Sequence, residues 1–436
     1  MKNNKSLKLT EKPIVPLMLE FWFSSLVPLV LYSLFTLTDA LFVSHCAGPD
    51  AMGGISIVLP FTVIQGAIST ALGGGASTAV AQYLGKGDKD SASRSALNAM
   101  VTFWVTALVI TAIGLIFCDP ILKILGATQE VYSYAKTYFL IIVAGNVFST
   151  GFSSIIRAEG ATVYGMLIWI IPIIINVIFD YLFVVLWGWG VAGSAVATAI
   201  CQFTSFSMSI LFFTRFSTLS FKGIKPNVKE LVPIIKTGIP SLVLSCCSAA
   251  SLTLINNGLA LFGESGSVTI YAYINRIITF TIMPFTAFSY AVIPICGANH
   301  TAGKTQRVKD AIKASSVLAI GIGAVMFILL FVFGSQVTSI FTDDAEVISG
   351  AGDVLKIIAP SLIFMPISMI FGAYYQCTKR IPKAVFYYAL NVIVLLIIVF
   401  PLSYFMNSTG TYIAVTASYI IACIITLITS KTKRSA

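Results

Sequence analysis

The sequence predicts an all-α polytopic membrane protein in which twelve transmembrane helices form two parallel, pseudo-symmetric lobes of six helices each. Three observations predict this fold: an apolar composition, a series of apolar segments of membrane-spanning length, and a repeat of the pattern in the second half. Of the 436 residues, 57% are apolar and only 10% are charged, against roughly 25% charged in an ordinary soluble domain. Because no soluble core could absorb this excess, we expect the lipid bilayer to surround the chain.

Twelve apolar segments follow one another, and each is long enough for the helix of about 20 residues that a bilayer requires. The first follows a basic N-terminus, as in a signal peptide, but it is too long for a signal sequence and lacks an obvious small-residue cleavage site. We therefore expect it to be retained. The predicted spans are 21–44, 53–83, 93–117, 132–156, 161–187, 190–214, 234–262, 266–296, 308–334, 348–376, 383–406 and 410–430.

Most of the 27 Lys and Arg residues fall in loops on one side of these spans, together with the N-terminus and the C-terminal tail. By the positive-inside rule that side is cytoplasmic, which predicts a multi-pass protein of the inner (plasma) membrane with both termini in the cytoplasm. The net charge of +10 then describes a membrane surface and requires no nucleic-acid partner. The predicted domains are an N-terminal lobe (1–215), a cytoplasmic linker (216–235) and a C-terminal lobe (236–436).

The two halves resemble each other at a shift of about 216 residues. Gly87-Asp88 after the second span matches Gly303-Lys304 after the eighth, and Glu130-Val131 matches Glu346-Val347. Each copy contains an even number of spans, so both copies have the same orientation. This predicts parallel lobes related by an axis along the membrane normal, with a substrate cavity between them.

Polar side chains at membrane depth are costly and often functional. Asp39 in the first span and Asp180 in the fifth both lie about 9 Å from the outer end of their helices, and Thr198 in the sixth span lies about 12 Å below the same surface, at 1.5 Å per residue. Asn176 precedes Asp180 by four residues and so shares its helix face. We expect three helices to bring these four side chains to one depth.

Such oxygen ligands suit Na⁺ or a proton. Burial disfavours a charged carboxylate, and a second carboxylate nearby disfavours it further, so one of the two aspartates could exchange a proton near neutral pH. The alternative is that each Asp only hydrogen-bonds a neighbouring helix. Arg276, the only basic residue well inside the C-terminal lobe, either lines the cavity or extends outward as an interfacial anchor, and the sequence leaves both open.

The sequence carries no signature of a resident cofactor. Its eight cysteines form no CxxC pair and have no His partners at metal-ligand spacing, so we expect neither a disulfide framework nor a metal, apart from Na⁺ at the cation site. A membrane-embedded enzyme would need a clustered nucleophile or a His/Asp metal set, which the sequence lacks. We therefore expect a protein that is not an enzyme.

Several stretches together resemble the multidrug and toxic compound extrusion (MATE) family, and the resemblance covers nearly the whole chain. It implies two six-helix bundles that export amphipathic, often cationic compounds in exchange for Na⁺ or H⁺. In the DinF-like branch of this family, which belongs to the MOP flippase superfamily, the cation site is formed by residues that Asp39, Asn176, Asp180 and Thr198 resemble. The NorM-like branch carries acids in the membrane part of its C-terminal lobe, and this chain has none deep in that lobe. The stretches are SLFTLTDALFVSHCAGPDAMGGISIVLP, GGGASTAVAQYLGKGD, RAEGATVYG, NVIFDYLFVVLWGWGVAGSAVAT and PICGANHTAGKTQRVKDA.

The resulting hypothesis is a secondary active antiporter for multidrug efflux. Its expected partners are a drug-like small molecule and the lipid bilayer, its only expected cofactor is the coupling ion, and we expect a monomer. The alternative within the same superfamily is a flippase for lipid-linked oligosaccharides. A flippase would favour a basic cavity to hold a diphosphate, whereas the deep charges here are two Asp against one Arg.

Overall fold

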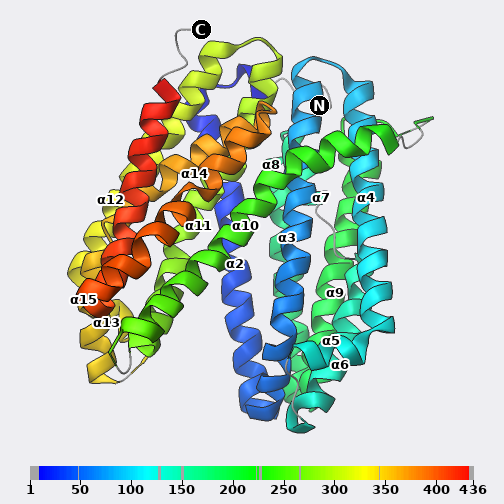
Figure 1. The fold of residues 1–436 in the computed structure, drawn as a ribbon. Coiled ribbons are helices and arrows are strands. Elements are labelled where there is room, and N and C mark those ends of the chain that lie inside the picture. The colour runs from blue at the N-terminus through cyan, green and yellow to red at the C-terminus, as the bar shows by residue number, and fades with distance from the viewer. Residues whose placement is uncertain are drawn as a thin grey trace. The chain divides into compact units, whose positions relative to one another are not determined.

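A computed structural model describes residues 9–47, 49–125, 129–148, 152–221, 223–224, 228–264, 267–342 and 344–431. Its regular elements in these ranges are helices (Figure 1). In the first half they are α2 (Ile14–Ala47), α3 (Pro49–Gly85), α4 (Lys89–Ile116), α5 (Cys118–Ile124), α6 (Gln129–Gly145), η1 (Asn146–Phe148), α7 (Phe152–Ala158), α8 (Thr162–Asp180), η2 (Tyr181–Leu186), α9 (Gly190–Leu211) and η3 (Phe212–Phe216). In the second half they are α10 (Val228–Phe262), α11 (Ser267–Thr301), α12 (Thr305–Thr338), α13 (Ala345–Ile358), α14 (Ser361–Cys377) and α15 (Ile381–Lys431).

These helices account for the twelve predicted spans. Within the described ranges, ten helical segments are individually long and apolar enough to cross a membrane, and α13 with α14, bent by 53°, makes an eleventh. The 51 residues of α15 would extend about 75 Å as one straight helix, far more than a bilayer core of about 30 Å. The chain turns at Asn407 (φ 53°, ψ −139°), and Figure 1 shows the two arms of α15 running back alongside each other. Helix α15 therefore supplies the eleventh and twelfth spans.

The six-span repeat is visible in the element bounds. Helices α3 and α4 are separated by the same short turn as α11 and α12, and both turns contain a glycine of positive φ, Gly87 (78°) and Gly303 (74°), 216 positions apart. The fourth span of each half is also broken: α6, η1 and α7 divide the first, and α13 and α14 divide the second. The predicted all-helical fold with two similar halves is thus confirmed.

The chain divides into two compact units that do not follow the halves of the sequence strictly. The first unit contains Val27–Gly238, whereas Lys12–Leu26 belongs to the second unit with the residues from Ile239 onward. The first part of α2 therefore packs in the second unit and the first part of α10 in the first. The predicted boundaries at 1–215, 216–235 and 236–436 remain a sequence-based prediction, and the described helix α10 begins at Val228, inside the predicted linker.

Specific contacts hold the first part of α2 in the second unit and the first part of α10 in the first unit. In the second unit, the indole ring of Trp22 stacks on Phe288 with centroids 5.4 Å apart, and its N–H donates to the carbonyl of Pro284 at 3.0 Å. In the first unit, Gly75 and Gly238 let the backbones of α3 and α10 touch, since a Cβ at either glycine would collide with a carbonyl of the other helix. Close approach of this kind is typical of small residues between membrane helices.

Two apolar clusters fill the first unit. One cluster joins α3, α4, α7, α8 and η3, with Leu72 and Phe152 among its members, and the other joins α3, α5, α6 and α9, with Val58 and Val143 among its members. Along α3, η1 and α9, four polar residues lie in the sequence between members of one cluster and members of the other. We call them the polar layer: Gln65, Asn146, Thr198 and Gln202.

Candidate cation-coupling site

Helix α8 carries two of the predicted site residues at its end. Asn176 and Asp180 lie one turn apart, and both side chains are completely buried. Directly after Asp180 the helix widens to a π-helix over Tyr181–Leu186; such segments are rare and frequent at functional sites. The fifth span thus presents an amide and a carboxylate on one face where its helical geometry changes.

Helix α9 packs against α8 and adds a hydroxyl and an amide. The carboxylate of Asp180 lies within electrostatic range of the Cys201 thiol on α9. On the same helix, Thr198 and Gln202 are four residues apart and therefore share a face. The structure thus brings together the helices that carry Asn176, Asp180 and Thr198.

Several polar atoms of this cluster are buried and have no hydrogen-bond partner among the residues that the structure describes. They are both side-chain polar atoms of Asn176, the hydroxyl of Thr198 and the amide oxygen of Gln202. An unsatisfied buried donor or acceptor costs about 1–3 kcal/mol. Most such groups in proteins are satisfied, and an exception is explained by a bound ion, by water or by function. The arrangement is therefore suited to receive a small polar or cationic ligand.

Asp39 lies in α2, but its side chain is outside the described residues. Its helix reaches α8 through Tyr32, whose ring meets Trp169 edge-on with centroids 6.2 Å apart. Tyr32 is also within electrostatic range of Cys201 on α9. Helices α2, α8 and α9 therefore converge, and the participation of Asp39 remains a prediction.

The remaining candidate from the sequence, Arg276, belongs to the second unit. Arg276 on α11 is exposed, and its guanidinium lies 6.0 Å from the ring centroid of Tyr273. Both sequence interpretations of Arg276 stay open, because exposure fits a cavity wall and an interfacial anchor alike. Among the described residues, no group of three or more His, Cys, Asp or Glu side chains is arranged to hold a metal ion.

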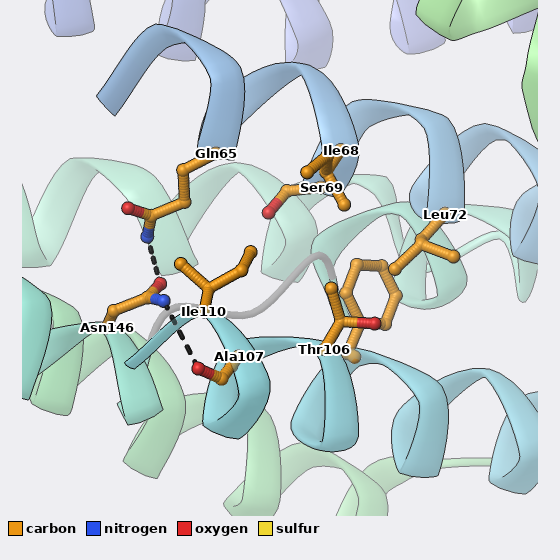
Figure 2. Close-up of a pocket in the computed structure, with 9 residues that line it drawn as sticks. Gln65, Ile68, Ser69, Leu72, Thr106, Ala107, Ile110 and Asn146 are labelled. Carbon is orange, nitrogen blue, oxygen red and sulfur yellow. Dashed lines mark hydrogen bonds between the residues drawn. The ribbon is translucent and has the colours of Figure 1, made fainter. Parts of the chain in front are cut away.

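Sequence reasoning missed three residues of the polar layer: Gln65, Asn146 and Gln202. In Figure 2, the amide nitrogen of Gln65 donates to the oxygen of Asn146, whose own nitrogen lies 3.5 Å from the carbonyl of Ala107. Gln65 and Asn146 line a small pocket between α3, α4 and η1. Neutral amides do not stand out in a search for buried charge. The available signal was an amide near the middle of the second, fourth and sixth spans.

The family of the chain follows from a comparison with known proteins. The family model described as MatE matches residues 25–182 and 240–405, most of both halves. The chain belongs to the MatE family. This confirms the resemblance seen in the sequence. Since MATE proteins are transporters, it also removes the membrane-embedded enzyme from the hypotheses.

Relatives and solved structures agree with this membership. The multidrug export protein MepA of Staphylococcus aureus (strain MRSA252) is 24% identical over 417 residues, 94% of this chain and 92% of the relative. MepA of Staphylococcus haemolyticus is 26% identical over 386 residues, 87% of this chain and 85% of the relative.

Two solved structures match the fold over 98% of both chains at 20% identity. One is an outward-facing conformation of a multidrug resistance MATE family transporter of the MOP superfamily (TM-score 0.91). The other is a MOP superfamily transporter from Pyrococcus furiosus whose binding pocket is described as having reverse polarity (TM-score 0.90). At this identity the likeness concerns the fold alone.

Proposed function

We propose that this protein is a secondary active antiporter that exports amphipathic, cationic small molecules in exchange for H⁺ or Na⁺. The observation that carries the proposal is the buried, unsatisfied polar cluster of Asn176 and Thr198 beside the carboxylate of Asp180. The MepA relatives are multidrug export proteins, which supports the substrate class. Asp39, Asn176, Asp180 and Thr198 would form the cation site.

The coupling mechanism follows from the cost of buried charge. A cation that enters from outside and reaches Asp39 and Asp180 neutralises one negative charge there, and each charge that crosses the membrane contributes about 2.3 kcal/mol per 100 mV. Because a ligand shifts an equilibrium only through its different affinities for the two states, neutralisation must favour one arrangement of α2 and α8. Pro28 and Pro172 lie inside these helices and supply bending points, since proline interrupts the hydrogen-bond ladder.

The proposed setting is the plasma membrane, with both termini and the basic loops in the cytoplasm. The protein would act as a monomer and would need no cofactor besides the coupling ion. A multi-pass protein with many apolar helices agrees with this setting. The orientation rests on the distribution of Lys and Arg among the loops.

A lipid-linked oligosaccharide flippase is less well supported. A diphosphate headgroup would require clustered cations, whereas the buried charge beside the polar layer is the carboxylate of Asp180. Arg276, the basic residue predicted to lie well inside the C-terminal lobe, is exposed in the second unit. Export of a fluorescent amphipathic cation such as ethidium would favour the antiporter over the flippase.

The test measures ethidium efflux from proteoliposomes under imposed gradients. Asp39→Asn and Asp180→Asn should each abolish efflux and leave the folded yield unchanged, and the matched control Asp353→Asn should retain wild-type efflux, because Asp353 is exposed and pairs only with Lys356 at 2.9 Å. Dissipating both the H⁺ and the Na⁺ gradients should stop efflux by the wild type. Wild-type rates from both aspartate variants, or efflux that continues on ATP alone, would refute the proposal.

A further inference from the structure

The pocket beside Gln65 has the chemistry of an ion site and lies outside the predicted coupling cluster. The Gln65 side chain is only 8% exposed. Its amide nitrogen donates a hydrogen bond to Asn146, but its amide oxygen has no hydrogen-bond partner among the described residues. The hydroxyl-bearing side chains of Ser69 and Thr106 line the same pocket (Figure 2). The pocket therefore offers neutral oxygen atoms, one of them buried and unsatisfied.

A hydrogen bond between helices explains only part of this arrangement. The contact between Gln65 and Asn146 is of the kind that joins membrane helices, yet it leaves an acceptor buried at a cost of about 1–3 kcal/mol. Only a donor or a cation can satisfy that oxygen. The pocket has a volume of about 10 Å³ for the centre of a water-sized sphere, which is about the space that one water molecule needs, so the occupant must be small.

The pocket is linked to the coupling cluster through α9. An added Cβ at Gly145 would lie 3.0 Å from the amide oxygen of Gln202, and Gly145 directly precedes Asn146. Gln202 is one turn from Thr198, and its amide oxygen is also buried, with no hydrogen-bond partner in the part of the chain that the structure describes. Helix α9 thus carries polar side chains from Thr198, on the helix that packs against α8, to Gln202, beside the residue that precedes Asn146.

We propose that Gln65 and Asn146 form a second binding site, or station, for a small monovalent cation, Na⁺ or hydronium. This station exchanges ions, through Gln202, with the proposed cation site at Asp39 and Asp180. The inference rests on the proposed antiport. Polar residues within membrane spans mark ion pathways, and neutral oxygens hold such an ion without requiring a change in their own protonation. A neutral station also releases the ion more easily than a carboxylate does, as conduction along successive sites requires.

The first test measures the cation concentration that gives half-maximal ethidium efflux, with Na⁺ varied at fixed pH and with pH varied in the absence of Na⁺. Gln65→Leu should raise this concentration about tenfold for the cation that drives wild-type efflux, and Gln202→Leu should act in the same direction. Gln336→Leu, the same substitution at an exposed position of α12, should behave like the wild type. Gln65→Glu should lower the half-maximal concentration, an effect that a merely structural role of Gln65 would not produce.

Binding without transport separates this proposal from the proposed function. The melting temperature is compared in NaCl and in N-methyl-D-glucamine chloride of equal ionic strength, because an ion that binds only the folded state stabilises it. If the wild type shows no gradient-driven efflux, the antiport proposal fails, and a Na⁺-dependent rise in melting temperature that is lost in Gln65→Leu but kept in Gln336→Leu would still support the station. A folded Gln65→Leu protein whose cation dependence of efflux and of melting equals the wild type would overturn it.

Discussion

The carboxylate of Glu159 accepts a hydrogen bond from the hydroxyl of Ser217, with distances of 2.8 and 2.9 Å to its two oxygens. Glu159 lies in the turn between α7 and α8 and is completely buried, whereas Ser217 follows the end of η3. The same carboxylate accepts the backbone N–H of Thr218 at 2.9 Å and its hydroxyl at 3.0 Å. One acid thereby joins the loop between the fourth and fifth spans to the end of the sixth.

This network predicts that Glu159→Ala lowers the free energy of unfolding by about 3 kcal/mol, because it leaves buried donors without an acceptor and hydrogen bonds to charged groups are stronger than neutral ones. Glu159→Gln retains the shape and should cost less. Thermal unfolding in detergent measures both variants. A double-mutant cycle with Ser217→Ala checks the contact, and additive effects of the two substitutions would contradict it.

Lys379 lies between α14 and α15 in the left-handed region, with φ 59°, and Gly160 holds the matching turn between α7 and α8, with φ 84°. A side chain in this conformation costs about 1 kcal/mol. Lys379→Gly should therefore be more stable than Lys379→Ala by about this amount. Since both variants lack the lysine side chain, their difference in melting temperature reports the energetic cost of the backbone conformation alone. Equal melting temperatures would show that the turn relaxes.

Asp119 on α5 lies outside the predicted membrane spans, and its carboxyl group should make the stability of the protein depend on pH. The ammonium of Lys136, at 2.8 Å, and the hydroxyl of Tyr132, at 2.7 Å, hold the pKa of its carboxyl below the usual value. A lowered pKa in the folded state means that the contribution to stability is present above the unfolded-state pKa of about 3.9 and is lost as the pH falls through the folded-state value. Asp119→Asn should melt below the wild type at pH 7. The difference should vanish in acid, and a difference that is independent of pH would rule out this linkage.

The positions of the spans were predictable because a bilayer requires long apolar runs, and the break between the last two predicted spans falls at Asn407. An ion pair three residues apart on one helix, such as Asp353 with Lys356, is equally local. The exchange of Lys12–Leu26 into the second unit was not predictable, because hydropathy gives no information on which helices a segment contacts. The π-helix after Asp180 likewise has no marker in hydropathy or spacing.

The candidate site was only partly accessible from the sequence. Asp180 and its neighbours were found because charged residues are rare in membrane spans and are easily recognised in an apolar sequence. Gln65 and Gln202 were not, since a neutral amide becomes informative only when its burial and missing partners are known. Which amide oxygens remain unsatisfied depends on the packing of α3, α6 and α9, so three-dimensional contacts were needed to connect them.

The crossing of α3 and α10 gives the last prediction. Gly75 lies against the carbonyl of Ile234 and Gly238 against the carbonyl of Ala71, so neither position has room for a Cβ. Gly75→Ala and Gly238→Ala should each force the two backbones apart and lower the melting temperature, with a cost of about 1–3 kcal/mol, as for an overpacked contact. Gly66→Ala on the same helix α3 is the matched control, because a Cβ there meets no atom within 4 Å and alanine is the better helix former. The control should therefore melt at or above the wild-type temperature, and the double variant should cost less than the sum of the single substitutions, because one separation of the helices relieves both contacts. Wild-type melting of both Gly75→Ala and Gly238→Ala would show that α10 does not touch α3 at these glycines.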